Sequence, residues 1–148
     1  MLQKWMFSFV FLLAVLSVNA QFRKIPAVVT DAFKAKYASA SGLEWKDKLT
    51  SFEADFKSGG KDMRAFFTSK GEWTKTETEN TFNSLPVEVK DGFKKSKYAD
   101  LSVLSVMQVE DKEKGFLYKI AVKKNDYNKR NLVFSASGQL VSDNGSII

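Results

Sequence analysis

The chain has 148 residues, of which 44% are hydrophobic and 14% aromatic, so it has enough apolar material for one packed domain. It contains neither cysteine nor histidine, which excludes disulfides, thiolate nucleophiles, histidine bases and zinc sites built on these ligands. The formal charge is +6, but only three of the 23 basic residues are arginine, the side chain best suited to phosphates and base edges. We therefore assign the positive excess to solvated surface and expect no nucleic-acid partner.

Residues 1–20 have the pattern of a secretory signal peptide. Lys4 gives a positive start, residues 5–16 form a short apolar run, and Val18-Asn19-Ala20 offers compact residues to a signal peptidase. The run is shorter than the roughly 20 apolar residues that a membrane-spanning helix needs. We expect a periplasmic or secreted bacterial protein without a membrane span after cleavage, and an uncleaved anchor is the alternative.

The remaining residues, 21–148, are predicted to form one domain made of two repeats, 25–80 and 85–144. The segments 25–37 and 85–98 each begin with an apolar residue and a proline, carry a central phenylalanine and end in a tyrosine. A proline is tolerated in the first turn of a helix. Apolar residues then follow at three- and four-residue spacing, so each segment is predicted to be an amphipathic helix.

Each predicted helix is followed by segments that are typical of antiparallel strands. In the first repeat, apolar and polar residues alternate along 52–57 and 63–68, and Ser58-Gly59-Gly60-Lys61 predicts a hairpin turn between them. Residues 74–79 are polar throughout, which favours an edge strand or an exit into a linker. The second repeat has strand patterns at 101–109, 116–123, 132–134 and 139–141, followed by a tail from 142 to 148 that we expect to be loose.

The predicted fold class is α+β. A unit of about 60 residues without disulfides is only marginally able to bury its own core. Two tandem helix-plus-antiparallel-sheet repeats that fuse into one sheet, with the helices on one face, would bury more. Phe33 and Phe93 should then occupy equivalent places between helix and sheet.

The sequence resembles the PepSY-like family in the doubled Ile/Leu-Pro helix, the Glu44-Trp45 strand and the Phe67…Gly71-Glu72-Trp73 hairpin. The resemblance covers nearly all of residues 25–144 and departs from the pattern where Leu140 stands at the place equivalent to Trp73. Members of that family are secreted bacterial proteins with tandem helix-plus-sheet units, similar in fold to β-lactamase-inhibitor proteins. The resemblance implies a non-catalytic periplasmic or extracellular binding protein, with enzyme inhibition as one role, and it implies no catalytic residues.

The acidic residues do not form a recognisable catalytic or metal site. Asp31 and Asp91 occupy equivalent helix positions, and their recurrence favours interaction with the helix dipole over a catalytic pair. The acidic cluster at 110–113 is interleaved with lysine and lacks the spacing of a calcium loop. We therefore predict a protein that is not an enzyme and has no cofactor and no metal.

The candidate partner site lies on the side of the sheet that the helices leave open. If the helices cover the side of Phe67 and Phe134, strand alternation places an apolar patch with a charged rim on the other side. Its residues are Arg64, Phe66, Leu117, Lys119 and Val133. We expect another envelope or secreted protein to bind there, and a homodimer or scattered exposed residues without a role are alternatives. A small-ligand carrier or a structural envelope protein is the second functional class.

Signal cleavage is predicted after Ala20, so that the secreted protein begins at Gln21. Measurement of the intact mass of the secreted form checks this directly. A secreted species that still carries Met1 would contradict the assignment.

Overall fold

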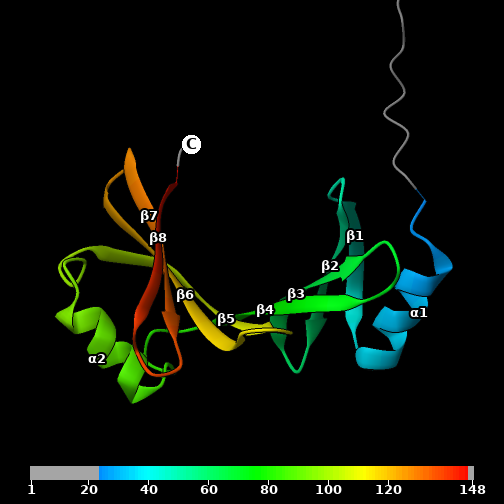
Figure 1. Ribbon diagram of the computed structural model, residues 1–148, viewed down its shortest axis with the longest axis horizontal. Coiled ribbons are helices and arrows are strands. Elements are labelled where there is room, and N and C mark those ends of the chain that lie inside the picture. The colour runs from blue at the N-terminus through cyan, green and yellow to red at the C-terminus, as the bar shows by residue number, and fades with distance from the viewer. Residues whose placement is uncertain (1–23, 147–148) are drawn as a thin grey trace, which may run out of the picture.

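A computed structural model describes residues 24–146, which fold into two α-helices and one eight-stranded antiparallel sheet (Figure 1). The elements in chain order are α1 (Ala27–Lys36), β1 (Ser41–Asp47), β2 (Ser51–Ser58), β3 (Lys61–Thr68), β4 (Trp73–Asn80), α2 (Val87–Lys95), β5 (Ser102–Asp111), β6 (Gly115–Asn125), β7 (Asn128–Ser135) and β8 (Leu140–Ser146). The strands lie side by side in sequence order, from β1 at one edge to β8 at the other. The predicted α+β class is confirmed, whereas the predicted signal peptide at 1–20 lies outside the described residues.

Both helices begin directly after a proline, as the sequence predicts. Pro26 and Pro86 are the N-cap residues of α1 and α2. The first N–H groups of a helix have no partner within the helix, so the missing N–H of proline costs nothing there. Neither helix in the described part of the chain is long and apolar enough to cross a membrane.

Each helix buries one valine and one phenylalanine against its own group of strands. Val29 and Phe33 of α1 pack on a cluster from β2 and β3, which contains Phe52, Ala54, Phe56, Ala65 and Phe67. Val89 and Phe93 of α2 pack on a cluster from β5, β6 and β7, which contains Val106, Tyr118, Ile120, Val122, Leu132 and Phe134. Phe33 and Phe93 are only 3% and 4% exposed, so the expected burial of both is confirmed.

Strand β4 differs from its prediction as an edge strand or linker. It lies between β3 and β5 in the middle of the sheet, and Thr76 and Glu77 are buried. The Thr76 hydroxyl accepts a hydrogen bond from the indole N–H of Trp73 at 2.8 Å and is also bonded to the Tyr37 hydroxyl. A strand of polar residues can be central because its buried side chains find partners.

Strand β8 corrects a second prediction, the loose tail from residue 142. Residues 140–146 pair with β7, where Asp143 lies opposite Leu132. The Asp143 carboxylate accepts hydrogen bonds from the Tyr98 hydroxyl and the Arg130 guanidinium. These contacts with other elements hold a strand whose own side chains are mostly small and polar.

The strand register defines which side chains share a face, because directly paired residues of antiparallel strands point the same way. Three adjacent rows cross the sheet as Arg64–Glu77–Val109–Leu117, Phe66–Lys75–Asp111 and Lys119–Val133–Ser142. We call the face that carries these rows the inner face. The strand residues of the two hydrophobic clusters alternate with these rows and point to the other face.

Glycine is required where two turns touch the helices. Gly71, between β3 and β4, has a φ of +80°, and a Cβ there would lie 2.6 Å from the carbonyl oxygen of Val28 in α1. Gly138, between β7 and β8, has a φ of +79°, and a Cβ there would lie 2.0 Å from the carbonyl oxygen of Glu88 in α2. Any larger residue would strain the turn and push the helix away.

We predict that Phe33→Ala and Phe93→Ala each lower the free energy of unfolding by about 3–5 kcal/mol, because each removes a buried ring from a packed cluster. Denaturant unfolding measures the loss, and Phe116→Ala is the control because Phe116 is half exposed. A large loss for only one of the two variants would mean that the helices are not anchored alike.

Candidate binding surface

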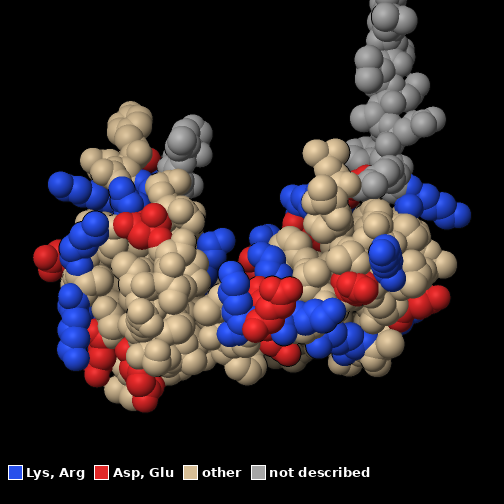
Figure 2. Space-filling model, viewed as in Figure 1, with Lys and Arg blue, Asp and Glu red and all other residues tan. Residues whose placement is uncertain are grey.

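The inner face lines a hollow between two arms of the sheet. Figure 1 shows β1–β2 and β7–β8 rising on the same side of the curved sheet, and Figure 2 shows the space between them. A depression of about 310 Å³ lies within this hollow. It is lined by apolar Val109, Leu117 and Val133, by charged Lys75, Glu77, Asp111 and Lys119, and by the amides of Asn131 and Asn144.

The structure brings the five predicted site residues to one face. Leu117, Lys119 and Val133 line the depression itself. Arg64 and Phe66 lie beside it on β3, where they pair directly with Glu77 and Lys75 of β4, and both β4 residues line the depression. The predicted residues therefore belong to one continuous surface that crosses β3 to β7.

The composition of this surface differs from the predicted apolar patch with a charged rim. The apolar residues of the depression are separated from Phe66 by charged residues of β4 and β5. The Nζ of Lys75 lies 4.3 Å from the centroid of the Phe66 ring, so this ring is partly covered by a cation. Sequence reasoning missed Lys75, Glu77 and Val109 because it placed β4 at an edge, although Lys75, Glu77 and Glu79 alternate as one face of a strand does.

Arg64 is the centre of a charge network on the inner face of the first four strands. Its Nε donates a hydrogen bond to Asp55 at 2.9 Å and lies 3.0 Å from an oxygen of Glu53, which is only 4% exposed. Lys48 lies 3.3 Å from the other Glu53 oxygen, and Lys46 bonds to Asp55. A buried carboxylate is costly unless it is paired, so these cations allow Glu53 to be buried.

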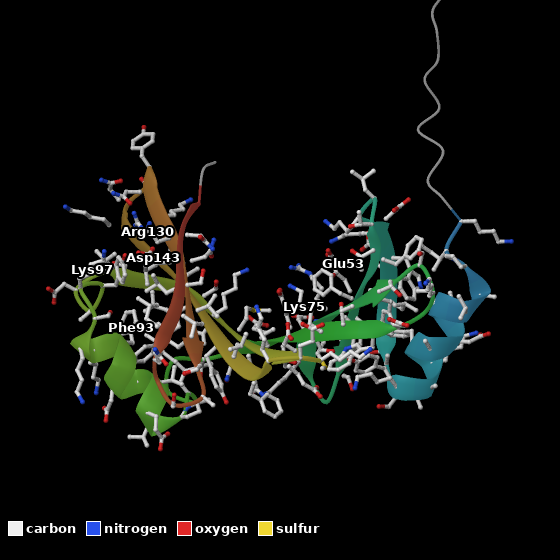
Figure 3. All side chains as sticks on the ribbon, viewed as in Figure 1. Glu53, Lys75, Phe93, Lys97, Arg130 and Asp143 are labelled. Atoms are coloured by element: carbon white, nitrogen blue, oxygen red, sulfur yellow. The ribbon has the colours of Figure 1, made fainter. Side chains whose placement is uncertain are left out.

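Glu77 extends the network towards the depression. It is 6% exposed, and its carboxylate lies 2.8 Å from the Nζ of Lys75 and 3.8 Å from Arg64. Figure 3 labels Glu53 and Lys75, and both point into the hollow. The carboxylates of Glu53, Asp55 and Glu77 are thus each paired with cations of the chain.

The same ion network shifts the pKa of the Asp55 carboxyl. Burial alone would raise its pKa, but hydrogen bonds from Lys46 and Arg64 outweigh burial and hold the pKa below the usual value. The pKa values of Lys46 and Arg64 are raised, chiefly by their hydrogen bonds to Asp55. All three groups therefore remain charged near neutral pH, and the network is a fixed arrangement of ions.

Unlike the lysines of this network, Lys119 has no ion-pair partner among residues 24–146. It projects from β6 beside apolar Leu117 and Val133 in the depression. A half-buried cation next to apolar side chains, without an anion of its own, is well placed to receive an acceptor from a bound molecule.

The structure separates the two recurring aspartates, Asp31 and Asp91. Asp31 and Asp91 are the fifth residues of α1 and α2, and the two helices lie at opposite ends of the molecule (Figure 1). Within 24–146, no three acidic side chains gather closely enough to hold a metal ion. The inner face thus carries an open hollow with paired charges, amides and a small apolar centre.

Comparison with known proteins agrees with this architecture. A family profile described as "Putative beta-lactamase-inhibitor-like, PepSY-like" matches residues 50–142. A "BLIP-like protein" from Bacteroides fragilis is 27% identical over 86% of this chain and 91% of its own, with a TM-score of 0.78. A protein from Bacteroides eggerthii, described as one of the "putative periplasmic proteins", is 29% identical over 82% of this chain and 89% of its own, with a TM-score of 0.77.

A third similar structure is a DUF2874 family protein from Bacteroides ovatus, which is 26% identical over 82% of this chain and 88% of its own, with a TM-score of 0.78. Among curated proteins, none matches the chain. The fold is thus that of a β-lactamase-inhibitor-like α+β protein of the bacterial periplasm or exterior. The chain belongs to the PepSY-like family.

We predict that Arg64→Ala lowers the free energy of unfolding by about 2–3 kcal/mol, because it leaves buried Glu53 and Glu77 with fewer cations. Lys57→Ala is the control, since Lys57 and Asp62 form an exposed ion pair that contributes little to stability. Urea unfolding of both variants measures the difference. Equal losses would show that the buried network contributes no more than a surface ion pair.

Proposed function

We propose that the protein is a non-enzymatic periplasmic or secreted binding protein that receives another envelope or secreted protein in the hollow of its sheet. The observation that carries this proposal is the combination, on one concave face, of an apolar centre, pre-paired charges and Lys119, which has no ion-pair partner among residues 24–146. Protein interfaces commonly have an apolar core inside a polar rim. Charges that are already paired within the chain are held in place before the partner arrives, which lowers the ordering cost of binding.

Inhibition or modulation of the partner is the proposed consequence of binding. The family is described as β-lactamase-inhibitor-like, and one relative is called a BLIP-like protein. A rigid hollow that encloses part of another protein would block whatever site lies on the enclosed part. This role requires no catalytic group, in keeping with a sequence that lacks both histidine and cysteine.

We also propose that residues 25–80 and 85–144 are structural repeats whose helices cover one face of the sheet. The row Met63–Thr78–Gln108–Tyr118–Phe134 supports the common face, since Met63 packs on the α1 cluster and Phe134 belongs to the α2 cluster. The matching contacts of Gly71 with α1 and Gly138 with α2 support the repeat. This arrangement would leave the inner face open along its whole length.

A carrier of a small molecule is the alternative favoured by the depression. Its volume of about 310 Å³ is at the lower end of the range for ligand pockets, roughly 300–1,000 Å³. Native mass spectrometry of the protein purified from the envelope would reveal a retained small molecule. A bound small molecule would support the carrier, whereas a protein complex of fixed stoichiometry supports the protein partner and a homodimer would assign the face to self-association.

We predict that a photo-crosslinker at Leu117 forms one discrete protein adduct in the cell envelope and that one at the neighbouring Phe116 does not, because the two side chains point to opposite faces. Adding Phe66→Glu should abolish the Leu117 adduct while thermal unfolding stays close to that of the parent protein.

Two results would contradict this prediction. An adduct from Phe116 alone would place the partner on the other face. Loss of several kcal/mol of stability in Phe66→Glu would show that Phe66 is part of the core and not of the site.

A further inference from the structure

The turn between β6 and β7 presents an aromatic ring to solvent. Tyr127 is 95% exposed, more than any other large hydrophobic side chain between residues 24 and 146. Figure 1 shows that this hairpin projects from the end of one arm, away from the body of the molecule. Burial in the fold does not explain this ring, because it is at the far tip of the hairpin.

The tip is held in a defined conformation. The side-chain oxygen of Asn125 accepts hydrogen bonds from the backbone N–H of Tyr127 at 3.1 Å and from that of Asn128 at 2.9 Å. Asparagine forms such local turns readily, and they reduce the freedom of the residues that they enclose. Binding through the Tyr127 ring would therefore lose little conformational entropy.

Three lysines lie at the base of the tip, and one of them is paired with a carboxylate. Lys123 and Lys129 lie directly opposite each other in the β6–β7 ladder, and Lys124 follows on the exposed surface. Lys123 reaches Asp126 at 3.2 Å, but neither Lys124 nor Lys129 has an ion-pair partner among the described residues. Like charges directly opposite on a sheet are destabilising, and an anion placed between them would relieve the repulsion.

The β1–β2 turn provides a comparison within the same molecule. Leu49 in this turn is 87% exposed, so this tip also carries an apolar side chain. The neighbouring Lys46 and Lys48, however, contact the carboxylates of Asp55 and Glu53. An exposed apolar tip with unneutralised lysines is therefore a property of the β6–β7 hairpin.

We propose that the β6–β7 hairpin binds the surface of an anionic phospholipid bilayer, with Tyr127 at the interface and Lys124 and Lys129 at headgroup phosphates. Tyrosine has an apolar body and a polar end, which suits the membrane–water boundary. Each lysine near an anionic surface strengthens partitioning about five-fold. A single ring at a protruding tip is far too small for a stable protein interface, which buries about 800 Å² on each partner.

This site is separate from the proposed partner site in the hollow. Tyr127, Lys124 and Lys129 do not line the depression, so the two proposed contacts use different residues. With one aromatic ring and few cations, the association should be reversible and sensitive to salt.

Vesicle co-sedimentation of the secreted form tests the proposal. We expect binding to vesicles of equal parts phosphatidylcholine and phosphatidylglycerol, weak binding to pure phosphatidylcholine, and release at high salt. Lys124→Gln combined with Lys129→Gln should weaken binding to the anionic vesicles about 25-fold. Lys34→Gln combined with Lys94→Gln removes the same charge from exposed helix positions and should change it less than about two-fold.

Fluorescence locates the contact. Tyr127→Trp should add an emission component that shifts to shorter wavelength on anionic vesicles, whereas Trp at Phe116, at the other end of β6, should show no shift. Equal losses in the two double variants, no preference for phosphatidylglycerol, or no shift at residue 127 would each overturn the proposal. Phe66→Glu should leave vesicle binding unchanged, so failure here is distinguishable from failure of the partner site.

Discussion

The antiparallel pairing of β4 with β5 is the constraint on which the rest of the structure depends. Residues 75–80 of β4 lie against residues 106–111 of β5, and this ladder joins the strands under α1 to the strands under α2. Without it, each half would be a helix on four strands with two open edges and a core near the lower limit of stability. With it, the residues of β3, β6 and β7 that line the hollow share one face.

The ion network on the inner face helps to specify this arrangement. A shift of one residue in the β2–β3 or β3–β4 register would move Arg64 to the face of the hydrophobic clusters and take one cation away from Glu53 and Glu77. Such a shift would bury an unpaired charge, which is far more costly than the pair itself is favourable. The polar inner face therefore constrains strand pairing in addition to the apolar face.

The sequence predicts the parts of the structure that follow from local pattern. The two prolines, the helical spacing and the buried Phe33 and Phe93 are recognised because helices are periodic over many residues. The five residues of the candidate surface are brought to one face because strand alternation fixes the side on which each lies.

The parts that sequence reasoning missed depend on contacts between distant segments. Strand β4 has no apolar residue in 74–79, and its burial comes from neighbours such as Tyr37 and Arg64. Strand β8 has small polar residues, and it is fixed by pairing with β7 and by Tyr98 and Arg130. The amides of Asn131 and Asn144 meet only because the register of β7 and β8 brings them together.

The separation of the two hydrophobic clusters has a mechanical consequence. The clusters share no residue, so each arm is stiffened by its own core, and β4 between them carries mainly polar side chains on both faces. The angle between the two arms is therefore set by the local twist of β4 and β5 and not by a shared core. Small changes in that twist alter the distance between the arms without disturbing either core. Related chains could thus bind partners of different width by varying only the residues of β4 and β5.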